Sequence, residues 1–293
     1  MQRTEKYFES DAFRKTAAGV ILAAEADAKT GGGRIALDGT VFYPEGGGQP
    51  ADRGTLTLAD GTVLHVTDVH ETNGIIWHTV DALPETAQPG AAVTGTIDWE
   101  WRFDKMQQHT GEHILSGIVH RRFGYDNVGF HMGADMVTID FSGMLTEEDL
   151  KAVEREANEV VWENRAIQIT HPSAQELEQL PYRSKKVLTG DVRIVTIENA
   201  DICACCGTHV TRTGEIGLIK IFSCVKFHEG VRLEILCGSR AYRYLSQVYD
   251  QDRAVAQLLS VKPQDTLAAA ERQAEELAAA KAEAADWQDI AAQ

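Results

Sequence analysis

The sequence predicts an α+β protein with a small β-barrel-like domain, a second domain of mixed helices and strands, and a helical C-terminal extension. Three observations support this fold class. Short apolar runs between glycine-marked turns fill the N-terminal third, helices interrupt antiparallel-type strands from Trp99 onward, and the chain after about Ser239 is rich in Ala, Glu and Gln. We therefore expect domain boundaries at 1–98, 99–238 and 239–293.

Glycine-marked turns shape the first domain. Asp-Gly pairs at 38–39 and 60–61 and the glycine run 31–33 separate short apolar strands, which predicts a small barrel or a curled sheet. The clearest expected strands are 19–22, 55–58, 62–66 and 93–98.

A longer glycine loop follows a predicted strand. It runs from Thr40 to Pro50 and contains Gly46, Gly47, Gly48 and Gln49. The loop has neither the Gly-Lys-Ser/Thr ending of a phosphate-binding P-loop nor the spacing of a dinucleotide-binding motif. Its glycines let backbone amides approach a ligand closely, and Gln49 adds a donor and an acceptor.

Helix signals dominate the second domain. The pattern that starts at Trp99 has no strand alternation and is stopped by Gly124, and Thr146 is a predicted N-cap for an acidic helix that ends near Asn164. The other expected elements are a strand at 135–142, a short helix from Ser173 to before Pro181, and strands at 192–197, 216–225 and 231–236.

The C-terminal extension carries one apolar stripe. Leu267, Ala270, Ala274 and Leu277 have coiled-coil spacing, but Lys281 and Gln288 break it. This pattern favours a solvated helix over a dimerising coiled coil, so a monomer and a homodimer formed through the tail both stay open. No stop signal follows Ile290, and we expect that the natural chain could continue past Gln293.

The 293-residue chain is acidic, with a net charge of −16, which argues against a protein that coats nucleic acid non-specifically. The excess is uneven, because residues 183–243 carry a net charge of +4. Arg183, Lys185 and Lys186 form a short basic patch there, for which phosphate contact and an ordinary solvated turn are both open. Without a signal peptide or a spanning apolar run, a cytoplasmic protein is expected.

Two pairs of residues have the spacing of metal ligands. His109 and His113 lie four residues apart in a predicted helix, and Cys205 and His209 have the same separation. Three imidazoles and a thiolate suit tetrahedral Zn²⁺. Cys203 and Cys206 are rivals for the thiolate position. Four protein ligands are typical of a structural zinc site, so whether the metal acts on substrate or only orders the pocket stays open.

Glu112 lies between the two histidines and is a candidate general base or a solvated helix carboxylate. The order His-x-x-Glu-His is also the signature of inverzincin metallopeptidases. Such an enzyme would take its third ligand from a downstream helix, here the acidic helix 146–164. It would have no use for Cys205 and His209, which counts against this alternative.

In combination, these motifs resemble the editing domain of alanyl-tRNA synthetase. The string from Thr40 to Gln49, the pair His109 and His113, and the run from Cys205 to Val210 follow one another in the order seen in that domain. With no aminoacylation domain ahead of it, the chain is most similar to the free-standing AlaX family, in its longer type with a helical extension. Smaller matches are Gly129–Gly133, Arg193–Val195 and the Cys237–Gly238 step.

The resemblance implies an ATP-independent hydrolase that serves translation fidelity. It would cleave the ester between tRNA(Ala) and a wrong amino acid, chiefly serine and with glycine as a further option, at the tRNA acceptor end. His109, His113, Cys205 and His209 would bind zinc, the glycine loop with Gln49 would line the aminoacyl pocket, and Thr40 would recognise the serine hydroxyl. The family often has Gly-Gly where this chain has Cys206-Gly207. A non-catalytic, zinc-ordered tRNA-binding module is the remaining alternative.

Overall fold

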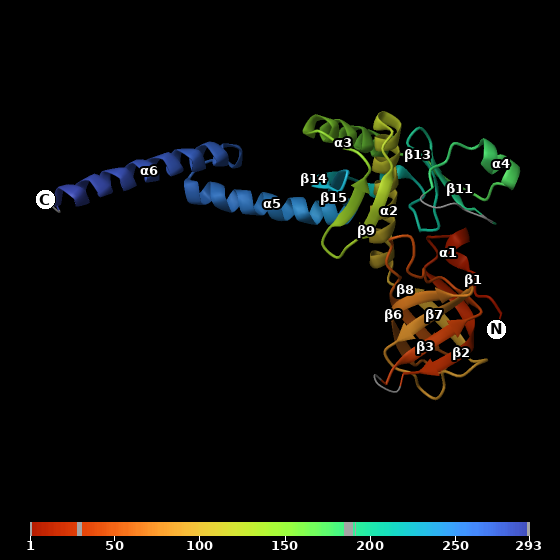
Figure 1. Cartoon of the computed structure of the whole chain (residues 1–293). Coiled ribbons are helices and arrows are strands. Elements are labelled where there is room, and N and C mark those ends of the chain that lie inside the picture. Colours follow the sequence, from red (N-terminus) through yellow and green to blue (C-terminus); the bar gives the residue numbers. More distant parts are fainter. Residues whose placement is uncertain (1, 28–30, 185–189, 191, 292–293) are drawn as a thin grey trace. The chain divides into compact units, whose positions relative to one another are not determined.

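A computed structural model describes residues 2–27, 31–184, 190 and 192–291 of the chain (Figure 1). The chain divides into two compact units, Met1–Ala241 and Tyr242–Gln293. The predicted α+β class is confirmed, with a closed barrel, three further sheets and several helices among the described residues. The boundaries expected at residues 98 and 238 stay predictions.

The barrel closes in the strand order β2-β3-β7-β6-β5-β8. Alternate residues of each strand point inward, so that Leu64 and Val66 are buried while His65 between them is exposed. The Asp-Gly pair at 60–61 makes the β5–β6 turn, where Gly61 has a φ of 87°. The strands are β2 (Thr16–Ala26), β3 (Gly33–Leu37), β5 (Gly54–Leu58), β6 (Val63–Thr72), β7 (Ile75–Val80) and β8 (Ala92–Ile97).

A short parallel pair and a one-turn helix precede and flank the barrel. Strand β1 (Glu5–Lys6) pairs with β4 (Gly39–Thr40), and helix α1 (Tyr7–Ser10) follows β1 directly. Strand β4 leads into the glycine loop, so the loop starts from a fixed point beside the barrel.

A four-stranded sheet and two helices form the second hydrophobic core. The sheet order is β14-β15-β10-β9, and all neighbouring strands are antiparallel. Its buried residues, including Ile139, Leu233 and Ile235, pack with Ile114 and Ile118 of α2. The elements are α2 (Trp99–Phe123), β9 (Asn127–Met132), β10 (Val137–Phe141), α3 (Glu147–Trp162), β14 (Ile219–Phe227) and β15 (Gly230–Cys237).

A smaller antiparallel sheet lies beside α2 and contributes its last strand, β13, to the contacts with that helix. It consists of β11 (Ile167–Thr170), β12 (Ile194–Ile197) and β13 (Asp201–Ala204), with helix α4 (Ala174–Gln179) in the connection from β11 to β12. The loop after β13 carries Cys205 and His209, so α2 and this sheet bring the two predicted pairs together.

The predicted helix signals are confirmed. The Asp98 side chain accepts from Trp101 N at the start of α2, and Gly124 ends the helix with a left-handed φ of 71°. Thr146 and Ser173 each cap a helix with a reciprocal capping box. The strand expected at 216–225 begins only at Ile219, because Thr213–Ile216 forms the 3₁₀ turn η1 and Gly217 (φ 82°) reverses the chain before the strand.

A buried arginine ties the barrel to α2. The Arg102 guanidinium is fully buried, pairs with Asp52 and donates to the carbonyls of Ala12 (2.8 Å) and Val41 (2.7 Å). Breaking such a buried pair by removing one partner costs about 3–5 kcal/mol. The barrel and the start of α2 are therefore held in one arrangement within the first unit.

The second unit is helical. Helix α5 (Gly238–Leu259) begins at the end of the first unit, and most of its residues belong to the second. The turn η2 (Pro263–Asp265) and helix α6 (Thr266–Ala291) follow it. Leu267 is 71% exposed and Leu277 is 55% exposed, as a solvated helix requires, and association through the tail stays a prediction. Among the described residues, none of the helices has the length and apolar character needed to cross a membrane.

Candidate metal centre

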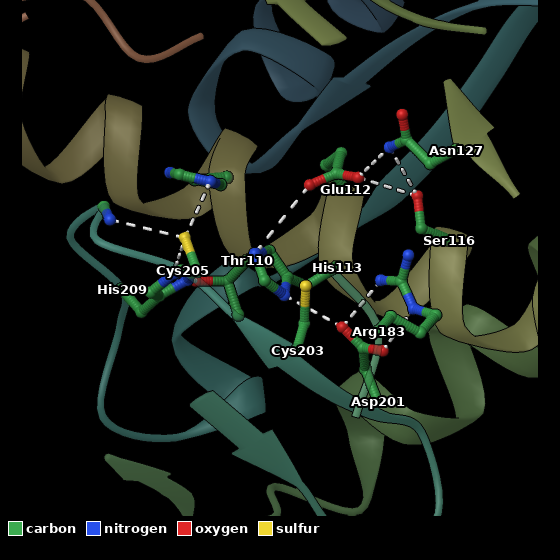
Figure 2. A network of polar contacts seen from close by, with 12 residues as sticks. Thr110, Glu112, His113, Ser116, Asn127, Arg183, Asp201, Cys203, Cys205 and His209 are labelled. Carbon is green, nitrogen blue, oxygen red and sulfur yellow. Dashed lines mark hydrogen bonds and ion pairs between the residues drawn. The ribbon is translucent and has the colours of Figure 1, made fainter. Parts of the chain in front are cut away.

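The four residues predicted as metal ligands converge in the structure. Figure 2 labels three of them, His113, Cys205 and His209. His109 and His113 project from successive turns of α2, and Cys205 and His209 come from the loop after β13. One ligand atom from each residue lies within 4.8 Å of all the others. The Cys205 Sγ is 3.5 Å from His109 Nε2 and 3.4 Å from His209 Nε2.

Each imidazole is oriented by a hydrogen bond at its Nδ1 atom. His109 Nδ1 lies 2.8 Å from Gln49 Oε1, and His113 Nδ1 lies 2.9 Å from Asp201 Oδ2. His209 Nδ1 lies 3.2 Å from the hydroxyl of Thr110, which itself donates to the Met106 carbonyl. These partners assign the proton to Nδ1 and leave each Nε2 facing the cluster, as is typical of metal-binding histidines.

The glycine loop delivers Gln49 to this cluster through a tight turn. Gly46 and Gln49 exchange two backbone hydrogen bonds, and both residues between them have positive φ, 59° at Gly47 and 85° at Gly48. A type I′ turn needs this backbone conformation, which glycine adopts without strain. A Cβ on Gly48 would lie 2.6 Å from the ring of Phe130, so the turn packs directly on strand β9.

Gln49 joins three parts of the site. Its Oε1 accepts from His109 Nδ1 and from Thr208 N, and its Nε2 donates to the Thr208 hydroxyl at 2.8 Å. The side chain is 1% exposed. The structure therefore places Gln49 as a partner of His109 and of the cysteine loop, a link that sequence reasoning missed.

The structure distinguishes Cys205 from its two rivals for the thiolate position. Cys206 is exposed, and Cys203 lies near His113 and Asp201 rather than inside the four-residue group. Burial opposes ionisation of Cys205, but the adjacent His109 and His113 outweigh it and hold the pKa of this thiol well below its usual value. Burial raises the pKa of Cys203 to about 11, so that residue stays a neutral thiol near pH 7.

Gly207 permits the close approach of the cysteine loop to α2. Its N–H donates to Cys205 Sγ at 3.3 Å, and a Cβ at this position would lie 2.1 Å from His109 Cε1. This chain has Cys206-Gly207 where the family it resembles often has Gly-Gly. The glycine that the close approach to His109 requires is therefore retained at position 207.

Glu112 is buried rather than solvated, with 4% exposure. Its Oε1 accepts hydrogen bonds from the Ser116 hydroxyl (2.7 Å) and from the Asn127 amide, while Oε2 lies 3.9 Å from His113 Nε2 (Figure 2). The structure thus rejects the solvated alternative and leaves Oε2 as the atom able to accept a proton.

Thr40 lies at the end of β4 with its hydroxyl engaged inside the barrel. The hydroxyl donates to His78 Nε2 at 2.8 Å and accepts from Phe42 N at 3.1 Å, while His78 Nδ1 donates to the Ile35 carbonyl at 3.0 Å. Burial lowers the pKa of His78 to about 4, which keeps the imidazole neutral and able to accept. Recognition of a serine side chain by Thr40 stays a prediction.

Several functional neighbours were not predicted from the sequence. Asp201 orients His113 and is itself held by Arg183 through bonds of 2.7 and 2.8 Å. Asp201 lies 88 residues from His113 and has no local motif, so only the packing of β13 on α2 reveals the pair. Thr110 is adjacent to His109, and a hydroxyl beside a predicted ligand was the one signal available.

The described member of the predicted basic patch is neutralised. Arg183, which is partly buried, forms an ion pair with the buried Asp201. Lys185 and Lys186 lie outside the described residues. Of the predicted patch, the residue that the structure describes therefore supports the metal cluster instead of facing solvent as a free cation.

The peptidase alternative requires a carboxylate ligand from the acidic helix. Three groups of side chains in the described part of the chain have the geometry to hold a metal, and none of them includes a residue of α3. The group around His109 and His113 is completed by Cys205 and His209. This donor set of three imidazoles and one low-pKa thiol fits a metal ion, with each donor already directed inward.

Comparison with known proteins defines the class to which this fold and site belong. Residues 5–101 match the family described as tRNA synthetases class II (A), and residues 192–233 match the threonyl and alanyl tRNA synthetase second additional domain. The second match covers Cys205 and His209. The class is therefore that of editing regions related to alanyl-tRNA synthetase.

Individual proteins that are similar to this chain support the same class. The chain is 35% identical over 222 residues to the alanyl-tRNA editing protein AlaX-L of Pyrococcus horikoshii, covering 73% of this chain and 54% of that protein. It is 37% identical to the alanine–tRNA ligase of Pyrococcus furiosus, over 81% of this chain and 27% of the ligase. It is 36% identical to the alanine–tRNA ligase of Halobacterium salinarum, over 93% of this chain and 30% of that ligase. The chain belongs to the AlaX family of alanyl-tRNA editing proteins. It spans between about a quarter and a half of the length of these relatives.

Proposed function

We propose that this protein hydrolyses the ester of mischarged tRNA(Ala), with seryl-tRNA(Ala) as its main substrate and glycyl-tRNA(Ala) as a further one. One observation carries the proposal. The His109, His113, Cys205 and His209 cluster is joined through Gln49 to the glycine loop, in a chain that belongs to an editing family. A metal-ligand cluster and a loop suited to ligand binding thus form one site.

Zinc is the metal we assign to the cluster. Three imidazoles and one thiolate are a donor set that zinc prefers, and burial lowers the pKa of His209 to about 3, so that this ligand is unprotonated at neutral pH. When bound, zinc supplies Lewis-acid polarisation of an ester carbonyl or of water, or it orders the pocket.

The chain's own residues supply the other requirements of ester hydrolysis. We assign Glu112 as the group that takes a proton from the attacking water at Oε2, because its Oε1 is already occupied by two donors. Gln49 and the Gly46–Gly48 turn hold the aminoacyl end, and Thr40 recognises the serine hydroxyl. Discrimination against alanine follows, because a site built to bond a hydroxyl leaves polar groups unpaired when that hydroxyl is missing.

The test is a deacylation assay with three substrates, seryl-, glycyl- and alanyl-tRNA(Ala), and no ATP. We expect rapid release of serine, release of glycine, and little release of alanine. Cys205→Ser should lose the release of both serine and glycine. Cys206→Ser is the matched control, since that exposed neighbour lies outside the four-residue cluster. Zinc-loaded wild type that binds seryl-tRNA(Ala) without releasing serine would contradict the proposal and favour a non-catalytic tRNA-binding module.

A further inference from the structure

Arg193 contacts the backbone on both sides of the Cys205 side chain and makes no hydrogen bond to the ligand atoms of the metal cluster. It lies one residue before β12 and is 6% exposed. Its Nη1 donates to the carbonyl of Cys205 at 2.7 Å and to the carbonyl of Gly207 at 3.0 Å. Its own backbone carbonyl accepts from Cys205 N at 3.1 Å. One residue therefore binds three backbone groups of the cysteine turn.

The cysteine turn needs such a partner because regular structure ends just before it. Strand β13 stops at Ala204, and the next regular element, η1, begins only at Thr213. The carbonyls of Cys205 and Gly207 therefore lie beyond the ladder bonds of the small sheet, in a turn where Gly207 is buried and Cys205 is partly buried. A buried carbonyl requires a donor, and a guanidinium nitrogen can serve two carbonyls at once.

The direction of these carbonyls determines where the sulfur lies. Gly207 N donates to Cys205 Sγ at 3.3 Å, so the sulfur and the two clamped peptide groups form one compact turn. Rotation of either peptide plane would move Sγ relative to the three imidazoles.

We propose that Arg193 is a positioning residue that fixes the thiolate arm of the metal cluster by clamping the Cys205 and Gly207 carbonyls. This inference rests on the metal site of the proposed function. It completes a pattern in which every ligand has its own holder. Gln49 holds His109, Asp201 holds His113, Thr110 holds His209, and Arg193 holds Cys205.

Arg240 offers a matched control elsewhere in the first unit. It is 7% exposed, its Nη2 donates to the carbonyls of Gly133 and Ala134, and one of its nitrogens is buried without a partner among the described residues, as is Arg193 Nε. The loop that it clamps joins β9 to β10 and carries no member of the cluster. Losing either arginine removes a buried carbonyl clamp, but only Arg193 acts on a metal ligand.

The experiment compares wild type, Arg193→Met, Arg193→Lys and Arg240→Met in two measurements. The first is zinc affinity by competition with a chelator, and the second is the thiolate-to-cobalt charge-transfer band of the Co²⁺-loaded protein. Loss of residues that orient metal ligands raises the metal dissociation constant about 10- to 100-fold. We expect this rise and a weakened or shifted band in Arg193→Met, an intermediate result in Arg193→Lys, and wild-type behaviour in Arg240→Met.

Folded Arg193→Met that binds zinc and shows the cobalt band as wild type does would overturn the inference. If Arg193→Met fails to fold, Arg193→Lys decides in the same two measurements, since the shorter side chain cannot serve both carbonyls and wild-type values would again overturn it. A wild-type protein that binds no metal would instead contradict the metal site of the proposed function. The two failures are therefore distinguishable.

Discussion

Replacing Gly207 by alanine is the most specific way to disturb the cluster without removing a ligand. The φ of this glycine is not in the left-handed region, so the effect is steric alone. The new Cβ would lie 2.1 Å from His109 Cε1, 2.4 Å from His109 Nδ1 and 3.1 Å from Gln49 Oε1. Ordinary contacts between carbon atoms begin near 3.5 Å, so the turn or the imidazole must move by roughly 1.4 Å.

A movement of this size breaks the bond of 2.8 Å between His109 Nδ1 and Gln49 and separates Cys205 from His109. Overpacking of this kind destabilises a fold by about 1–3 kcal/mol. We expect zinc affinity to fall about 10- to 100-fold, because both the orientation of His109 and the position of the thiolate change. The assay is a chelator competition titration, accompanied by a thermal melt of the metal-free protein to separate binding from folding.

Gly46→Ala is the control, because a Cβ at that position has its nearest neighbour, the Tyr43 hydroxyl, at 3.4 Å. It should bind zinc as wild type does. If folded Gly207→Ala also binds zinc with wild-type affinity, the close approach of the cysteine loop to His109 does not determine the site, and the reasoning is refuted.

Three further predictions concern Asp201, Thr40 and His78. Asp201→Asn should weaken zinc binding about tenfold in a competition titration, because it removes the carboxylate that accepts from His113, and unchanged affinity would count against that role. Thr40→Val should reduce the preference for seryl- over alanyl-tRNA(Ala) in a deacylation assay, and an unchanged preference would remove Thr40 from substrate recognition. His78 should make unfolding pH-dependent, since burial lowers its pKa from 6.5 to about 4 and the unfolded chain binds the extra proton. Stability from this group is complete above pH 6.5 and is lost as the pH falls toward 4, so the loss measured by denaturant unfolding should be about 3 kcal/mol larger in wild type than in His78→Gln.

Local signals in the sequence predicted most of the fold and all four members of the cluster. Thr146 and Ser173 could be recognised as helix starts because a capping box involves only four consecutive residues. Gly124 could be recognised as a helix end because the left-handed conformation that ends a helix is a local property of glycine. The equal spacing of His109 and His113 and of Cys205 and His209 reflects a requirement of metal binding itself. Such features need no knowledge of distant contacts.

The contacts that sequence reasoning missed join residues far apart in the chain. Gln49 and His109 are 60 residues apart, and Asp201 and His113 are 88 apart, so neither pair leaves a local pattern. The basic residues show the converse difficulty. The run of positive charge at 183–186 left a phosphate contact and an ordinary solvated turn both open, but Arg183 forms an ion pair with the buried Asp201. Charge along the chain does not tell which cations remain free after folding.

The most direct test of the account measures serine release from seryl-tRNA(Ala) while zinc is returned to metal-stripped protein. If the four-residue cluster holds the metal that editing needs, the rate should rise with added zinc and level off at one equivalent per chain. Cys205→Ser should stay inactive through the same titration, whereas Cys206→Ser should follow wild type. Full activity of the stripped protein, or a rate that ignores zinc, would contradict the central claim that this cluster is the metal centre of an editing enzyme.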